Sequence, residues 1–322
     1  MKKKFSINKL GAWRIYFIFF YIVAVALTAH YVHEGYNSFF EKKRSVMELA
    51  AYKISSDFIN ILNHAEDTLN GINKKIVRSG GSKANISDIL ISSGQKYNDN
   101  LLQYELSTGK FYWIDAENNL IANSEYGLIA NTIDLSGRDY LQKTSLNAGK
   151  IYTGEPIIGA SSGQFVIPVG VGAENAQGHY VGTMAVSFKL SELTARYSEI
   201  ADLHQVNFAV LNSENHIIFE SEDGVFAHDK KLFSDLATKE INEAEEFVAP
   251  YSLRDRKNSY IILRASDKYP YKILTGYQNK ILQQELLFRI IIWAAQFLLI
   301  TVFFASAMFY SRKEDKDKKK RK

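Results

Sequence analysis

The stretch FYWIDAENNLIANSEYG, residues 111–127, returns 97 positions later as FAVLNSENHIIFESEDG, residues 208–224. Seven of the seventeen positions are identical and three more are conservative exchanges. Each copy places β-forming residues on both sides of a polar, Asn-containing segment, which predicts a β-hairpin. Because self-similarity at a fixed period indicates a repeated structural unit, we expect two similar α+β modules in series; chance similarity between two hairpins is the alternative.

Further β-rich runs lie between the two copies. They occur near Ile151 and over residues 164–172 and 180–188, and a turn-like segment at residues 173–178 separates the last two. Together with the first hairpin, these runs predict an antiparallel meander of about five strands.

Two runs without a charged side chain flank this region, Ile15–Val32 and Ile290–Tyr310. Each is close to the roughly 20 residues that cross a bilayer as a helix. The first run could be a cleaved signal peptide, but it is longer than most such apolar segments and has only a weak cleavage site. We therefore expect transmembrane helices at residues 15–33 and 286–310.

The charges are segregated along the chain. Residues 1–14 and residues 311–322 each carry a net charge of +5, which leaves −6 for the remainder of a chain whose total is +4. The positive-inside rule then places both tails in the cytoplasm and residues 34–285 outside the plasma membrane, in the periplasm or extracellular space. An acidic exterior disfavours nucleic-acid binding, whereas the basic tails favour contact with membrane lipid.

Residues 34–84 are expected to form one long external helix. Between Tyr36 and Val77 it would span roughly 60 Å, and Gly80 and Gly81 would end it. Its apolar side chains recur at spacings of three and four, and they are Met47, Ala51, Ile54, Phe58, Ile61, Ala65, Leu69, Ile72 and Ile76. The predicted fold class is an α+β membrane protein in which two transmembrane helices flank this long helix and two tandem antiparallel-sheet modules, over residues 85–198 and 199–285.

Five short motifs occur in an order that resembles a known family. They are DLSGRDY at 134–140, GKIYTGEP at 149–156, SGQ at 162–164, YVGTM at 180–184 and KYPY at 268–271. In this order, between two membrane helices, they resemble the double Cache extracellular sensor domain of bacterial signalling receptors, built from tandem PAS-like modules. The resemblance covers residues 34 to about 285. It implies a membrane-distal module that binds a ligand and a membrane-proximal module that follows it.

Arg138 is the most informative residue of these motifs. Ser136 and Asp139 fit the N-cap and N3 positions of a capping box, which leaves Arg138 in the first helical turn, where a cation opposes the helix dipole. One interpretation is that Arg138 grips a carboxylate with its two parallel N–H groups. The alternative is a solvated surface arginine.

The resemblance implies which residues face the ligand. It implicates Arg138 and Tyr140 with Tyr152 on the following strand, and more weakly Ser161, Ser162 and Gln164. Trp113 could line the same pocket, although core packing is the alternative for Trp113 and Tyr152.

Two departures from the family bear on the ligand. Amino-acid-sensing members place aspartates at the positions of Gly159 and Ser187, where they hold the ligand ammonium. Without them a buried ammonium would be unpaired, at a cost of several kcal/mol. The sequence therefore disfavours an α-amino acid and favours a small carboxylate or other anion.

No catalytic or cofactor motif is present. The chain has no P-loop, Gly-x-Ser-x-Gly or His-Glu-x-x-His motif, and zero cysteines exclude a disulfide scaffold, a thiol nucleophile and Cys-based metal sites. His30 and His33 are the only close histidine pair, at an ordinary interfacial position. We expect no enzyme activity, no cofactor and no metal.

The expected function is a membrane-anchored extracytoplasmic ligand sensor. Only residues 311–322 follow the second span, and they are too charged to fold, so the output is expected in a separate signalling partner. We also expect a homodimer through the long helix. The alternatives are the sensor fragment of a truncated histidine kinase or diguanylate cyclase, and a structural or adhesion ectodomain without a ligand.

Overall fold

A computed structural model describes residues 5–101, 110–160, 163–212, 215–221, 226, 246–249, 261–265, 269, 271–277 and 279–320. The chain divides into two compact units. One comprises Met1–Val46, Ser252–Asn258 and Tyr277–Lys322, and the other comprises Met47–Tyr251 and Ser259–Gly276.

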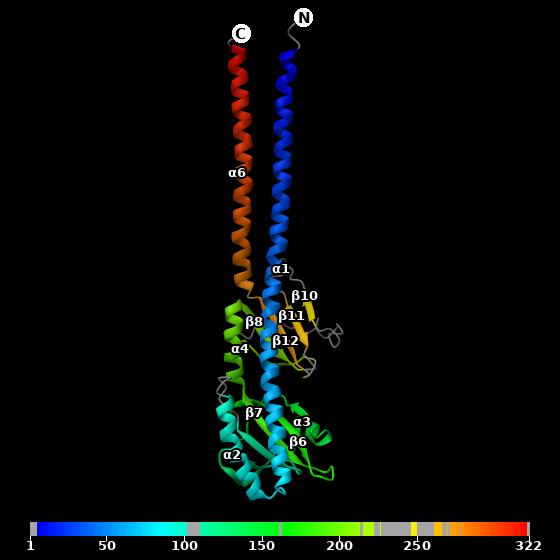
Figure 1. Cartoon of the computed structure of the whole chain (residues 1–322). Helices are drawn as coiled ribbons and strands as arrows, with labels where there is room; N and C mark the ends of the chain where they lie inside the picture. The colour runs from blue at the N-terminus through cyan, green and yellow to red at the C-terminus, as the bar shows by residue number, and fades with distance from the viewer. Residues whose placement is uncertain are drawn as a thin grey trace. The chain divides into compact units, whose positions relative to one another are not determined.

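Helix α1, Phe5–Arg78, is continuous from the N-terminal apolar run into the long amphipathic segment (Figure 1). All nine predicted stripe residues are buried, which confirms the predicted apolar face. Gly80 and Gly81 follow the helix with φ of 79° and 65°, and their N–H groups donate to Val77 O and Ile76 O, both at 3.1 Å. Glycine adopts this left-handed backbone without a side-chain clash, so the pair ends the helix where the sequence predicted.

Helix α6, Asn279–Lys320, contains the second apolar run. Two helices, one containing each run, are long and apolar enough to cross a membrane. The expectation that residues 311–322 cannot fold was wrong, because α6 continues to Lys320. Lysine and glutamate are good helix formers, and lengthening an existing helix requires no new nucleation.

The distal sheet has seven strands, not the five or so that the sequence predicted. Its strand order is β3-β2-β1-β7-β6-β4, with β5 also paired to β6. The strands are β1 Phe111–Asp115, β2 Asn119–Asn123, β3 Gly127–Asp134, β4 Ile151–Thr153, β5 Ile157–Ile158, β6 Phe165–Glu174 and β7 Tyr180–Lys189. The predicted meander was also wrong, because in a meander each strand pairs only with its neighbours in sequence, whereas here β1 pairs with β7. Such long-range pairing leaves no local signal, and β3 is a largely exposed edge strand with weak apolar alternation.

Among the residues that the structure describes, three shorter helices accompany the two sheets. They are α2 Lys83–Leu101, α3 Asp139–Leu146 and α4 Leu190–His204. Helix α4 joins β7 to the proximal sheet, and it ends at Gln205 in the left-handed conformation with φ of 56°. The predicted module boundaries at 84/85 and 198/199 fall inside α2 and α4.

The proximal sheet has five described strands in the order β10-β11-β12-β8-β9. They are β8 Val206–Leu211, β9 Ile217–Glu220, β10 Glu246–Ala249, β11 Ile261–Ala265 and β12 Lys272–Tyr277. Five buried aromatic rings pack edge-to-face or stacked between this sheet, α1 and α4, and they are Phe58, Tyr197, Phe208, Phe219 and Tyr271. Aromatic contacts of this kind add stability beyond the area that they bury.

Helix α1 lies alongside both sheets (Figure 1). Asn73 Nδ2 donates to Val171 O at 3.1 Å in the distal sheet, and Thr275 Oγ1 donates to Met47 O at 3.3 Å in the proximal one. Arg196 on α4 also forms a two-pronged ion pair with Asp57, with both N···O distances at 2.7 Å. The buried face of α1 therefore supports both modules.

Candidate functional site

The distal module contains a cavity of about 50 Å³ on the face of the sheet that α3 covers. A void of this size has room for several water molecules. The cavity is lined by Tyr112, Ile114, Leu120, Leu135, Arg138, Tyr140, Ile157, Gly159, Ala160, Val166, Pro168, Ala185, Val186 and Ser187. Most of these side chains are aliphatic, so the wall is apolar apart from a few convergent polar groups.

The start of α3 differs from the predicted capping box. Arg138, not Ser136, is the N-cap residue, with φ of −91° and ψ of 122°. The Asp134 carboxylate accepts the Ser136 N–H at 2.8 Å, and Arg138 N–H donates to Leu135 O at 2.9 Å, so a tight turn occupies the predicted first helical residues. The Asp134–Ser136 hydrogen bond also lowers the pKa of Asp134. This turn brings the Arg138 side chain to the cavity wall.

Arg138 is the only charged residue among the described residues that line the cavity. Its guanidinium donates to Ile158 O at 3.4 Å, a long hydrogen bond to the exposed strand β5. A guanidinium has five N–H donors, so one such contact leaves most of them available to an anion. Arg138 therefore supplies the positive charge of the site.

Tyr140 forms part of the cavity wall and is 4% exposed. Its ring lies against two glycines, because a Cβ atom at Gly154 or Gly170 would come within 3.1 or 3.0 Å of the ring carbons. Burial raises the pKa of Tyr140 well above its usual value. The phenol is therefore neutral at physiological pH and can donate a hydrogen bond to a carboxylate.

Helix α3 is fixed to the sheet by buried hydroxyl groups. The Thr144 and Thr183 hydroxyls lie 2.7 Å apart, and the Tyr180 hydroxyl lies 2.7 Å from Thr183 Oγ1. Both threonines are fully buried. This network holds the helix that carries Arg138 and Tyr140 in a defined position.

Of the seven residues predicted for the site, Arg138 and Tyr140 line the cavity and the other described ones do not. Tyr152 packs beside the core cluster that contains Tyr140, on the edge strand β4. Gln164 is exposed, and its backbone carbonyl accepts the Gly159 N–H at 2.8 Å. Ser161 and Ser162 lie outside the described residues.

Trp113 packs away from the cavity. Successive strand residues point to opposite faces, and Tyr112 and Ile114 on either side of Trp113 line the cavity. Trp113 is 3% exposed, and its ring would lie 2.8 Å from a Cβ at Gly182. Core packing is therefore the role that the structure gives Trp113.

Several lining residues were missed by the sequence reasoning, among them Tyr112, Leu135 and Pro168. The alternation in β1 could have suggested Tyr112, whereas Pro168 and Leu135 come from segments that meet only in the folded sheet. Gly159 and Ser187, the positions at which the double Cache resemblance implies aspartates in amino-acid sensors, both line the cavity. The described lining residues thus include no carboxylate to pair with an ammonium group.

No group of three or more potential metal ligands occurs within the described part of the chain. The arrangement that it does contain is a small apolar cavity with a guanidinium and a neutral phenol at its wall. Such a site can bind a small anion with an apolar body by charge-assisted hydrogen bonds.

Comparison with known proteins identifies the fold. No family model and no curated protein matches the sequence. Among solved structures, an extracellular ligand binding receptor from Desulfohalobium retbaense has a TM-score of 0.54 and 13% identity over 74% of this chain, which spans 40% of that receptor. The sensory domain of the Campylobacter jejuni chemoreceptor Tlp3 with bound isoleucine has a TM-score of 0.52 and 12% identity over 76% of this chain and 94% of its own.

The ligand-binding domain of the Pseudomonas fluorescens chemoreceptor CtaA, in complex with L-serine, has a TM-score of 0.53. It is 14% identical over 74% of this chain and 97% of its own length. The protein therefore has the fold of extracellular sensory ligand-binding domains, of the Cache type. The fold is thus shared at sequence identities of only 12–14%.

Proposed function

We propose that this protein is a membrane-anchored extracytoplasmic sensor whose distal cavity binds a small carboxylate without an α-ammonium group. The cavity composition is the observation that supports this proposal. Arg138 is the sole charge among the described lining residues, and glycine and serine occupy the two positions from which aspartates would hold an ammonium. A carboxylate would gain charge-assisted hydrogen bonds there, whereas an ammonium would lose its hydration without a partner.

The sensor fold and the two apolar helices support membrane anchoring, with both termini in the cytoplasm and residues 34–285 outside. The basic tails would contact anionic lipid, and the exposed length of α1 would carry a homodimer contact. The protein itself would be a receptor without enzymatic activity, acting on a separate signalling partner.

A cluster formed by Lys43, Tyr277 and Glu285 would couple a conformational change in the sensor to the second membrane helix. Lys43 on α1 is 9% exposed, and its ammonium donates to the Tyr277 hydroxyl at 3.1 Å and to Glu285 on α6 at 2.9 Å. Tyr277 is the last residue of β12. A shift of β12 on ligand binding would thus be transmitted to both helices through Lys43.

The test is a thermal-shift titration of the purified full chain with matched pairs of ligands, such as propionate against alanine and butyrate against 2-aminobutyrate. We expect saturable stabilisation by members without the amino group. Arg138→Ala should weaken their binding by about 10- to 100-fold, because hydrogen bonds to charged groups contribute about 1.5–3 kcal/mol.

Lys150→Ala is the matched control, since Lys150 is exposed, carries the same charge and does not line the cavity. It should leave binding unchanged. Stronger stabilisation by the amino acids would contradict the proposed ligand class. Binding that is indifferent to Arg138→Ala would place the ligand elsewhere, and no saturable response to any carboxylate would favour an ectodomain without a ligand.

A further inference from the structure

The two apolar helices pack on each other within their own compact unit. The Tyr21 hydroxyl lies 3.4 Å from Thr301 Oγ1, and the Tyr21 and Phe304 rings are 5.4 Å apart. At the other end of the pair, a Cβ at Gly35 would lie 3.1 Å from the Trp293 ring. α1 and α6 thus form a close helical pair that hides one face of each.

Three hydroxyl-bearing side chains in the two apolar runs, Tyr21, Thr28 and Thr301, have a hydrogen-bond partner within the helical pair. Thr28 Oγ1 donates to Ala24 O at 2.8 Å, and Thr301 Oγ1 donates to Phe297 O at 2.9 Å. Serine and threonine hydroxyls can donate a hydrogen bond to a carbonyl of the preceding helical turn in this way. This bond lowers the free-energy cost of placing the hydroxyl in a bilayer. These three hydroxyl groups are therefore satisfied without a partner from outside the helical pair.

Gln296 differs from them. It lies six residues inside the uncharged run Ile290–Tyr310, about 9 Å from the end of the run at 1.5 Å per residue. Its side chain is exposed and makes no hydrogen bond to any residue that the structure describes. A carboxamide has two N–H donors and an acceptor oxygen, and leaving them unsatisfied in hydrocarbon costs several kcal/mol.

Gln296 also lines an open groove of about 460 Å³ between the two helices. The other lining residues are Leu27, Thr28 and Tyr31 on α1 and Leu299 and Ile300 on α6. Thr28 and Tyr31 are the other lining residues with polar side-chain atoms, and the Thr28 hydroxyl already donates to Ala24 O. The groove is thus an apolar surface with a short polar strip, the pattern by which membrane helices associate.

We propose that this groove is the seam of a homodimer in which Gln296 pairs with Gln296 of a second copy across a two-fold axis. A carboxamide is self-complementary, so two copies related by such an axis can exchange two N–H···O=C bonds and satisfy both groups. A lipid chain cannot do so. The inference rests on the proposed membrane anchoring and homodimer, and it adds a contact surface between the two copies and the residue that selects it.

The absence of cysteine from the chain makes single-cysteine cross-linking a direct test. Leu299→Cys would lie on the seam beside Gln296, whereas Leu298→Cys, 64% exposed, lies on the opposite side of α6. Full-length variants in native membranes are oxidised and the disulfide dimer is quantified. We expect at least fivefold more dimer from Leu299→Cys than from Leu298→Cys.

Gln296→Leu in the Leu299→Cys background should lower dimer formation by about three- to thirtyfold, the range expected for interhelical hydrogen bonds. Gln296→Asn keeps the carboxamide and should keep most of the dimer. Thr301→Val is the matched control, because Thr301 faces Tyr21 within the same chain. Equal cross-linking of the two cysteine variants, a Gln296→Leu variant that dimerises normally, or a disulfide to another protein would overturn the seam.

Membrane topology is measured separately, so that the two proposals can fail independently. A membrane-impermeant maleimide applied to intact cells should label Ser38→Cys and leave Lys313→Cys unlabelled. If that pattern fails, the proposed membrane anchoring is wrong. If it holds and the cross-linking fails, the homodimer seam alone is wrong.

Discussion

The two β-hairpins of the distal and proximal modules share their backbone geometry almost residue for residue. Tyr112 pairs with Asn123 and Ile114 with Leu120 in β1–β2, and at positions 97 residues later Ala209 pairs with Glu220 and Leu211 with Ile217 in β8–β9. Both ladders shift register at the same place, between Trp113 and Ile114 and between Val210 and Leu211. The repeated sequence therefore encodes a repeated structure.

The turns match as well. Asn118 and Asn215 both have φ of 65°, and their N–H groups donate to Asp115 O and Asn212 O, both at 3.1 Å. The side chains of Asp115 and Asn212 accept the N–H four residues on, at 2.7 and 2.8 Å. Asparagine tolerates the left-handed backbone better than most residues, which explains its presence in both turns.

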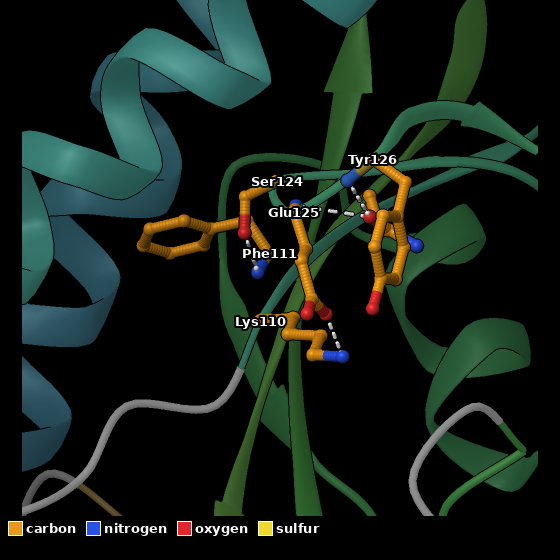
Figure 2. Close-up of polar contacts among 6 residues, drawn as sticks. Lys110, Phe111, Ser124, Glu125 and Tyr126 are labelled. Atoms are coloured by element: carbon orange, nitrogen blue, oxygen red, sulfur yellow. Dashed lines mark hydrogen bonds and ion pairs between the residues drawn. The ribbon is translucent and has the colours of Figure 1, made fainter.

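The far end of the first hairpin is shown in Figure 2. Ser124 N–H donates to Phe111 O at 2.9 Å while Ser124 Oγ accepts the Phe111 N–H at 3.0 Å, and Lys110 forms an ion pair with Glu125. The equivalent Ser221 N–H donates to Phe208 O, also at 2.9 Å. The identical serine therefore closes the strand pair in both modules.

The difference between the hairpins lies in the face that meets α3 in the distal module. Tyr112 and Ile114 line the distal cavity, and Tyr112 is only partly buried. Their counterparts Ala209 and Leu211 are both 0% exposed. Ile114 is also 0% exposed, so the two faces differ at Tyr112. One backbone pattern thus carries either an open face with a small cavity beside a partly exposed tyrosine or a closed, fully packed face.

The largest effects are expected at Phe111 and Phe208, the equivalent phenylalanines that begin the two copies of the repeated sequence. They are 1% and 0% exposed. We expect Phe111→Ala and Phe208→Ala each to lower the free energy of unfolding by about 3–5 kcal/mol, because both remove a fully buried ring. Urea denaturation of the purified chain measures the change. A loss under 1 kcal/mol in either module would show that the two hairpins are not equivalent in energy.

Exchanging the residues that differ should give unequal effects. Ala209→Tyr forces a large ring into a packed site and is expected to cost about 1–3 kcal/mol of stability. Tyr112→Ala removes a partly exposed ring beside a cavity and should cost less than about 1 kcal/mol, since little packing is lost. Both are read by the same denaturation assay, and a reversed order would contradict the contrast between an open and a closed face.

The ligand class of the open face can be sharpened at Ser187. Ser187→Asp places a carboxylate on the cavity wall, where it can pair with a ligand ammonium. We expect the preference for alanine over propionate to rise by about tenfold or more, equivalent to about 1.4 kcal/mol, in isothermal titration calorimetry. Ser187→Asn supplies the matched uncharged control. An unchanged preference would argue that the ligand does not contact Ser187.

The smallest effects are expected at the turns. Asn118→Ala and Asn215→Ala keep the Cβ but remove the short polar side chain that makes φ of 65° tolerable for asparagine, and each should cost about 1 kcal/mol. Asn118→Gly and Asn215→Gly should be nearly neutral, because glycine adopts this conformation freely. Thermal denaturation measures all four. Equal costs at the two sites would extend the structural equivalence of the hairpins to their energies.

Much of the fold followed from local patterns. The stripe from Met47 to Ile76, the glycine pair after Arg78 and both hairpins depend on periodicity and turn chemistry, which the chain expresses within a few residues of each position. The extra strands and the pairing of β1 with β7 were not predicted from the sequence. The β1–β7 pairing depends on contacts between segments about 70 residues apart.

The candidate site was predicted less completely. Arg138 and Tyr140 were found through a motif, and the structure brings them to one cavity. Trp113 was misplaced because β1 is buried on both faces, so hydrophobicity alone did not reveal which face meets α3. The turn at Asp134 also moved the helix start by two residues from the predicted cap at Ser136.

By itself, the sequence determined the uncharged runs, the segregation of charge and the repeated hairpin, because each is a property of neighbouring residues along the chain. The tertiary structure alone decided that Arg138, Tyr112, Pro168 and Ser187 surround one void. These residues belong to four separate segments, and only the pairing of β1 with β7 and β7 with β6, under helix α3, brings them together. The physical reason is that residues this far apart in sequence become neighbours only through strand pairing and packing between segments.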